Sequence, residues 1–241
     1  MNIFKILAII AIIGAALTGC QSTTVVQENT EHPCYNICVL LDGTDRLSQE
    51  NSVPLISQED ILSLAERIAY QGTGSLYVSY IDENSRNNPL AVFEWWLLKP
   101  HPVAEKREHI KQVEYDMEVE AYEKAMQKYS SELESALEKF SNDIRRLVME
   151  AYSDEVASEK TGSDVYGAVN KAHRALLCNE KAQTAHIIMF SDCQDNVGNT
   201  LQDISPATEL IVVNANYEDN GLSGLASRQF VIFDQVINYL F

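Results

Sequence analysis

Five short apolar segments, rich in β-branched and aromatic residues, alternate along the chain with segments of helical spacing. They are 35–41 (YNICVLL), 74–81 (GSLYVSYI), 91–98 (AVFEWWLL), 185–192 (AHIIMFSD) and 209–216 (ELIVVNAN). Apolar runs of this length are typical of strands that are buried on both faces. Strands that alternate with helices predict an α/β fold: a Rossmann-like, mostly parallel central sheet with helices on both faces.

The helices expected around this sheet have recognisable ends. Ser57-Gln58-Glu59-Asp60 has the spacing of a capping box, and Gly72 stands where that helix should end. Segment 161–177 reads as a turn that runs into a second helix. The tail predicts a docking helix, with a strand at 230–233 as the alternative, from apolar residues at Phe230, Ile232, Val236, Ile237 and Leu240.

A helical insertion is expected over about 104–153, where Glu, Lys, Ala and Met become frequent. An apolar stripe recurs there at intervals of four and three residues: Leu133, Leu137, Phe140, Ile144 and Leu147. Forty-odd helical residues would span about 60–75 Å. The segment therefore either projects as an arm or folds back, and the capping-box spacing at 131–134 would mark the break. Its charges fit a solvated face or a contact surface.

The first residues have the features of a secretory signal. Lys5 precedes an apolar run that is shorter than the roughly 20 residues a transmembrane helix needs. Leu17-Thr18-Gly19-Cys20 resembles the bacterial lipobox, whose cysteine becomes the lipid-modified first residue of the mature protein. This resemblance implies a signal peptide at 1–19, lipidation of Cys20 and a polar tether over 20–33. An uncleaved membrane anchor is the alternative. Gln21 favours the outer membrane.

The charge balance excludes one class of partner. The chain has 35 acidic and 18 basic residues, a formal net charge of −17, so its surface repels the phosphate backbone of nucleic acids. Four cysteines follow Cys20 in a compartment that permits disulfides, and the sequence alone does not choose their pairing. No Cys or His spacing suggests zinc.

Two of the predicted strands end in aspartate, Asp42 and Asp192, and sites in parallel sheets gather at the carboxyl ends of strands. One interpretation is phosphoryl transfer. Asp42-Gly43-Thr44 resembles the end of the Asp-x-Asp-Gly-Thr motif of haloacid-dehalogenase-like phosphatases. The nucleophilic aspartate of that motif would fall at Leu40, which cannot attack phosphorus. A phosphate-ester hydrolase that uses the Asp42 and Asp192 loops stays as an alternative.

A second resemblance covers residues 35–216 apart from the insertion. The sequence is similar to a von Willebrand factor type A domain, whose metal-ion-dependent adhesion site lies on three loops. Those loops correspond to 42–46 (DGTDR), 161–164 (TGSD) and 190–193 (FSDC). The resemblance implies that a divalent cation such as Mg²⁺ is bound by Asp42, Thr44, Ser163 and Asp192. Two carboxylates and two hydroxyls suit a hard cation, which keeps a free position for a partner's carboxylate.

Arg46 departs from the family pattern, because it stands where the family has a second serine. A guanidinium has no acceptor and cannot bind a cation. Close to the site, Arg46 would oppose the ion and could pair with Asp42 or Asp192, and the metal would be lost. If Arg46 instead points outward, the site is kept and Asp45 adds a nearby carboxylate. In this fold the first strand neighbours the strand before Asp192, which places Cys34 and Cys178 at the opposite edge of the sheet. The resemblance thus favours a Cys34–Cys178 disulfide.

Together these features predict a lipid-anchored, non-catalytic module of the cell envelope, placed in the outer membrane, with a VWA-like domain over 34–241. It would bind a protein partner in adhesion or assembly, through the three loops or through the inserted helix. A scaffold that acts only through the inserted helix is the third hypothesis, beside the hydrolase.

Overall fold

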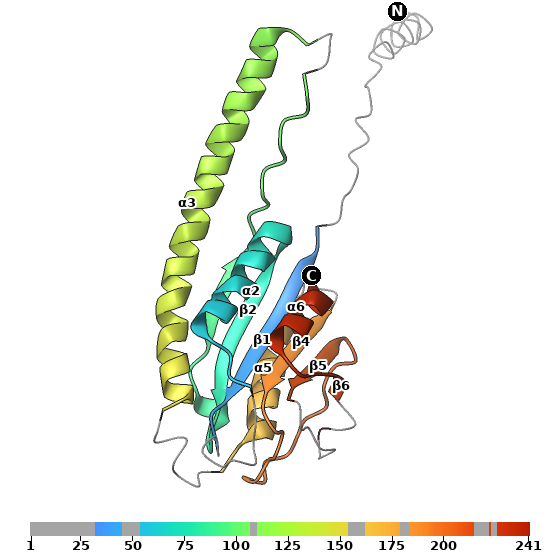
Figure 1. Ribbon diagram of the computed structural model, residues 1–241. Coiled ribbons are helices and arrows are strands. Elements are labelled where there is room, and N and C mark those ends of the chain that lie inside the picture. The colour runs from blue at the N-terminus through green and yellow to red at the C-terminus, as the bar shows by residue number, and fades with distance from the viewer. Residues whose placement is uncertain are drawn as a thin grey trace, which may run out of the picture. The chain divides into compact units, whose positions relative to one another are not determined.

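The strands form one six-stranded sheet in the order β3-β2-β1-β4-β5-β6 (Figure 1). The computed structural model describes residues 32–44, 54–106, 110–153, 162–178, 184–214, 222 and 226–241. The strands are β1 (Cys34–Asp42), β2 (Thr73–Ile81), β3 (Ala91–Trp95), β4 (Ala185–Phe190), β5 (Thr208–Val213) and β6 (Ala226–Phe230). Among them only the β2–β3 pair is antiparallel. The expected α/β fold with a mostly parallel sheet is confirmed.

The central strand β1 is buried on both faces, because its apolar side chains alternate between two cores. Ile37, Val39 and Leu41 face one core, which also contains residues of α2, α3 and α6. Cys38 and Leu40 face the other core, which contains residues of α5. This two-sided burial is the physical reason why the segment reads as a continuous apolar run.

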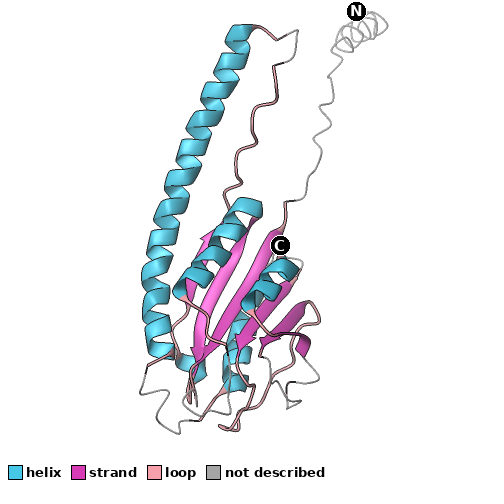
Figure 2. Cartoon of the chain, viewed as in Figure 1, coloured by secondary structure: helices cyan, strands magenta, loops and turns pink. Residues whose placement is uncertain are grey.

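The helices cover the sheet unequally (Figure 2). Helices α2 (Gln58–Gln71), α3 (Gln112–Ala151) and α6 (Phe233–Leu240) pack on one face, and α5 (Val165–Leu177) packs on the other. A short 3-10 helix, η1 (Ser85–Asn87), follows β2. No helix in the described part of the chain is both long enough and apolar enough to span a membrane.

Helix α2 begins and ends where its sequence signals lie. The Asp60 N–H donates to Ser57 Oγ over 3.1 Å and the Ser57 N–H donates to Asp60 Oδ2 over 3.0 Å, which is a complete capping box. The Gly72 N–H donates to the carbonyl of Ile68 over 3.0 Å. A Cβ at Gly72 would lie 2.1 Å from the carbonyl oxygen of Pro33, so only glycine fits against the start of β1.

The insertion is one continuous helix, α3, of 40 residues. The break expected at 131–134 is absent, and the chain does not fold back there, because Leu133 continues the buried stripe without interruption. The buried side chains of α3 begin at Tyr129: Tyr129, Leu133, Phe140, Ile144, Leu147 and Ala151. The Tyr129 hydroxyl donates to the carbonyl of Ala69, near the end of α2, over 2.6 Å. Residues 112–128, the arm, therefore extend past the amino-terminal edge of the sheet (Figure 1).

At its other end α3 reaches the carboxyl-terminal edge of the sheet. A Cβ built on Gly43 would lie 1.6 Å from the carbonyl oxygen of Ala151, so the last turn of α3 rests directly on the loop after β1. The Tyr152 hydroxyl also accepts a hydrogen bond from the Ile56 N–H, over 3.4 Å. The C-terminal half of α3 thus spans the sheet from one edge to the other.

Several element boundaries differ from the expectations. The third strand stops at Trp95, and Trp96 is exposed, because only alternate residues of this edge strand face the core. The tail contains both a strand and a helix, with the strand at 226–230 rather than at 230–233. The predicted signal peptide, Cys20 and most of the predicted tether lie outside the described residues, which belong to the unit His32–Phe241.

Candidate functional site

The candidate site lies where the strand order reverses. β1 pairs in parallel with both β2 and β4, and Leu41 is in register with Phe190. The chain leaves β1 toward β2 and returns later to β4, so the loops after β1 and β4 diverge at this point. Doubly wound sheets with the order 3-2-1-4-5-6 bind ligands in the crevice outside the carboxyl ends of the strands at such a switch point.

Asp42, the last residue of β1, accepts hydrogen bonds on both carboxylate oxygens. Its Oδ1 accepts from the Thr44 N–H over 3.0 Å and from the Thr44 hydroxyl over 2.6 Å. Its Oδ2 accepts from the Ser191 hydroxyl over 2.5 Å. The Thr44 hydroxyl also makes a short contact with Ser163 Oγ. The structure thus brings together Asp42, Thr44 and Ser163, three of the four residues that the resemblance implied.

Asp42 is only 5 % exposed. Burial raises its pKa to about 6, and the hydrogen bonds from Ser191 and Thr44 oppose that rise because they favour the charged form. The charge of Asp192 raises the pKa further, which means that the two carboxylates interact. Asp192, the fourth implied residue, is half-buried, and its Oδ1 accepts from the Gln194 N–H over 3.0 Å.

Ser163 is positioned by the loop that follows β4. Its N–H donates to Asn196 Oδ1 over 2.6 Å, and the Asn196 N–H donates back to the Ser163 carbonyl over 3.2 Å. The N–H of Tyr166, in the first turn of α5, donates to Asp195 Oδ1 over 3.0 Å. The Asp195 carboxylate thus satisfies a free N–H group in the first turn of α5, where the helix dipole also favours negative charge.

Asp164 is the N-cap of α5. Its Oδ1 accepts from the Gly167 N–H over 2.8 Å and from Asn199 Nδ2 over 2.7 Å. The Asp164 N–H donates to the carbonyl of Asp82, in the loop after β2, over 2.7 Å. Three loops at this edge are therefore linked by hydrogen bonds, and their relative positions are fixed by the same residues that start α5.

Ser191 is a site residue that sequence reasoning missed. Its hydroxyl binds Asp42, and its carbonyl accepts from Asn214 Nδ2, after β5, over 3.1 Å. The Cys193 N–H donates to the Ser191 hydroxyl over 2.9 Å. The one available signal was its place next to Asp192 at the end of a buried strand, and Asp195, Asn196 and Asn199 carried only the general signal of capping residues in a loop.

The cysteines of the described chain are free thiols. Burial raises the pKa of Cys193, so this residue at the site is a protonated packing group. Cys178 is exposed, and its Sγ donates to the carbonyl of Arg174 over 3.4 Å. The Cys34–Cys178 disulfide is not formed in this structure, and the pairing stays a prediction.

The chemistry of the donor set fits a hard cation. Two carboxylates and the hydroxyls of Thr44, Ser163 and Ser191 gather at one edge, and all of these ligands are oxygen. Within the described ranges no three His, Cys, Asp or Glu side chains cluster as a metal-binding group. The five donor groups named above include neither an imidazole nor a thiolate, the ligands that zinc prefers. Asp45 and Arg46 lie outside the described residues.

The chain was compared with protein-family models, with curated proteins and with solved structures, and none of them matches.

Proposed function

We propose that the chain is a membrane-anchored, non-catalytic module of von Willebrand factor A type that binds a protein partner in the cell envelope, with its lipid attached at Cys20 in the outer membrane. The observation that carries this proposal is the contact of the Thr44 hydroxyl with both Asp42 Oδ1 and Ser163 Oγ. The adhesion site of a von Willebrand factor A domain requires these three groups, from two loops more than 100 positions apart, to meet at one edge of the sheet.

Asp42, Thr44, Ser163 and Asp192 would bind the cation in this proposal. A bound divalent cation supplies positive charge for a carboxylate of the partner. The chain's own part is to fix the ligands: Ser191 orients the Asp42 carboxylate, and Asn196 orients the backbone of Ser163. Hydrogen bonds of this kind, made to the ligands themselves, tune the affinity of metal sites.

The hydrolase alternative has less support. In that mechanism a carboxylate at position 40 would attack phosphorus, and Leu40 is 1 % exposed within the core next to α5. A side chain at this position faces the core between the sheet and α5, and not the carboxyl-terminal edge where a substrate would bind. A generic phosphatase assay, repeated on Asp42→Asn, tests this alternative directly.

One observation favours the arm as a second binding surface. Val113 and Met117, one turn apart on the same side of the arm, are 69 % and 65 % exposed. Exposed apolar side chains next to one another on a projecting helix are typical of contact sites. Replacing both with serine would weaken partner capture from the native envelope if the arm binds, and would leave it unchanged if the loops alone bind.

The cation site is tested by calorimetric titration of the protein with Mg²⁺, Mn²⁺ and Ca²⁺, and by thermal shift with each ion. We expect binding that is lost in Asp42→Asn. Asp203→Asn is the matched control, because Asp203 is exposed and lies between Gln202 and Ser205, whose N–H groups donate to Asn170 and His173 further along α5. The cation version of the proposal fails if the unaltered protein gives neither heat nor a thermal shift with any of the three ions.

A further inference from the structure

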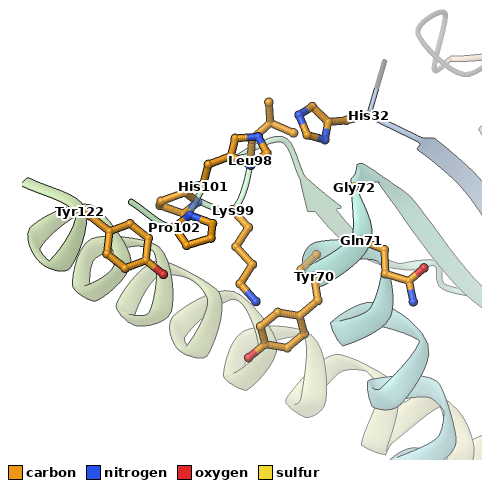
Figure 3. A pocket seen from close by; sticks show the side chains of 11 residues that line it. His32, Tyr70, Gln71, Gly72, Leu98, Lys99, His101, Pro102 and Tyr122 are labelled. Atoms are coloured by element: carbon orange, nitrogen blue, oxygen red, sulfur yellow. The ribbon is translucent and has the colours of Figure 1, made fainter. Parts of the chain in front are cut away.

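A cavity of about 320 Å³ lies at the opposite edge of the sheet from the candidate site (Figure 3). It is bounded by the end of α2, by the segment that follows β3 and by the arm. Its polar side chains come from these three places and from the residue where the tether ends: Tyr70, Gln71, Lys99, His101, Tyr122 and His32.

The charge of this cavity is opposite to that of the molecule. The lining contains Lys99 and two histidines but neither aspartate nor glutamate, in a chain whose net charge is −17. Lys99 Nζ lies 5.0 Å from the centre of the Tyr70 ring, and Figure 3 shows the lysine pointing at that ring. Among the described residues no carboxylate pairs with Lys99, so the ring positions the ammonium group without neutralising it.

The two histidines converge although they are far apart in the chain. The ring centroids of His32 and His101 are 5.7 Å apart. An imidazole carries at least one N–H donor in either protonation state, and a lysine carries three. Tyr122 adds a hydroxyl. The cavity thus presents several donors and one fixed positive charge, which is the chemistry that binds a phosphate group.

The position of the cavity indicates where such a phosphate would come from. His32 is separated from Cys20 by a chain that spans at most about 40 Å when fully extended. A lipid attached at Cys20 would therefore keep this edge of the sheet near the membrane surface. The membrane as the source of the phosphate rests on the proposed lipid attachment at Cys20.

We propose that the cavity binds the phosphate of an anionic membrane-lipid headgroup and so fixes the orientation of the domain on its membrane. Lys99 supplies the charge, His32 and His101 donate hydrogen bonds, and Tyr70 and Tyr122 form the walls. A second contact with the membrane, beside the lipid at Cys20, leaves the domain one orientation, with the Asp42 edge facing away from the lipid surface.

Calorimetric titration of the full chain in a non-ionic detergent tests the proposal, with dihexanoyl-phosphatidylglycerol, dihexanoyl-phosphatidylcholine and inorganic phosphate as probes. We expect phosphatidylglycerol to bind more tightly than phosphatidylcholine, whose ammonium group is repelled by Lys99. Lys99→Gln should weaken phosphatidylglycerol binding about fivefold, the loss expected for one basic residue at an anionic surface. His101→Gln should weaken it as well.

The matched control is Lys128→Gln, which removes an exposed lysine of α3 that pairs with Glu132 over 3.8 Å, outside the cavity. Equal weakening by this variant, or no binding of phosphatidylglycerol, overturns the proposal. Inorganic phosphate that binds as tightly as phosphatidylglycerol overturns the lipid source. These outcomes do not depend on Cys20, because the probes are added free. The mass of the chain isolated from its membrane tests the lipid attachment separately.

Discussion

Ser191 and Asp42 are 149 positions apart in the chain and are joined by a hydrogen bond of 2.5 Å. The bond crosses from the end of β4 to the end of β1, and it is buried. Because Asn214 in turn binds the Ser191 carbonyl, the carboxylate of Asp42 is held by groups from three neighbouring strands. Its environment is therefore set by the neighbouring strands as well as by Thr44 of its own loop, and this has consequences for stability.

The raised pKa of Asp42 predicts that its charge destabilises the folded protein at neutral pH. The folded pKa is about 6 and the ordinary value is 3.8, so the folded state binds more protons than the unfolded state between these values, and stability falls as the pH rises through them. Asp42→Asn removes this term. We expect it to be more stable than the unaltered protein at pH 7.5, by up to about 3 kcal/mol.

Urea unfolding at pH 7.5 and at pH 3.5 measures this difference. At pH 3.5, which is below both values, Asp42 is mostly protonated in both states, so most of the advantage of Asp42→Asn should disappear. Asp203→Asn, in an exposed position, should show no such pH dependence. A gain of the same size at both pH values would mean that the effect is not electrostatic.

Cation binding should have the opposite pH dependence. A cation needs the ionised carboxylate, so binding releases the proton that Asp42 carries below pH 6. We expect the affinity for Mg²⁺ at pH 7.5 to exceed that at pH 5 by about tenfold, from the ionised fraction alone. Titration calorimetry in two buffers of different ionisation enthalpy detects the released proton. An affinity that does not change between pH 5 and 7.5 contradicts the assignment of Asp42 as a ligand.

Arg46→Ser should raise the affinity for divalent cations. In the proposed site the substitution supplies the hydroxyl that the von Willebrand factor A pattern has at this position, and it removes a guanidinium whose charge would oppose the ion. An increase of about tenfold corresponds to the removal of roughly 1.4 kcal/mol of repulsion. Arg67→Ser, on the exposed side of α2, is the control for a change in net charge. If both variants bind Mg²⁺ equally well, Arg46 does not affect the site.

Gly43→Ala tests the contact between α3 and the loop after β1. The new Cβ would lie 1.6 Å from the carbonyl oxygen of Ala151, so the helix end or the loop must move. Overpacking of this kind costs about 1–3 kcal/mol, and the displaced loop carries Asp42 and Thr44, so cation binding should weaken too. Gly198→Ala is a useful contrast: nothing lies within 4 Å, and its φ of +81° should cost only about 1 kcal/mol.

Tyr129→Phe tests the hydrogen bond that joins α3 to the end of α2 at the amino-terminal edge of the sheet. The substitution keeps the aromatic packing against Trp95, whose ring centroid lies 5.3 Å away, and removes the hydrogen bond to the Ala69 carbonyl. We expect a loss of about 1–2 kcal/mol in the free energy of unfolding, measured by urea titration, because a buried acceptor loses its partner. Tyr115→Phe, on the arm, should have no effect on stability.

Local sequence signals predicted the elements of this fold well where periodicity was strong. The buried strand at 35–41 and the capping box at Ser57 both appear as expected. The signals did not reveal β6, because this strand is short and its segment, ASRQF, is more polar than the buried strands. The stripe on α3 predicted an apolar face, but nothing in it told which surface this face would cover.

The candidate site was predictable to the extent that it depends on strand ends. Asp42 and Asp192 each follow an apolar run, and parallel strands place such residues at one edge. Ser191 and Asn196 could not be assigned in advance, because their roles depend on the register between β1 and β4 and on the course of the loop after β4. The cavity at the other edge was also invisible, since its two histidines meet only after β1 and the segment following β3 are placed side by side.

The length of β1 keeps the two edges of the sheet about 30 Å apart. A partner captured at Asp42 would therefore not compete for space with a headgroup bound beside Lys99. In the proposed arrangement each occupant would exchange without displacing the other, and a large partner would approach from the side that faces away from the membrane. The strand acts in this respect as a spacer that sets the separation of the two proposed contacts.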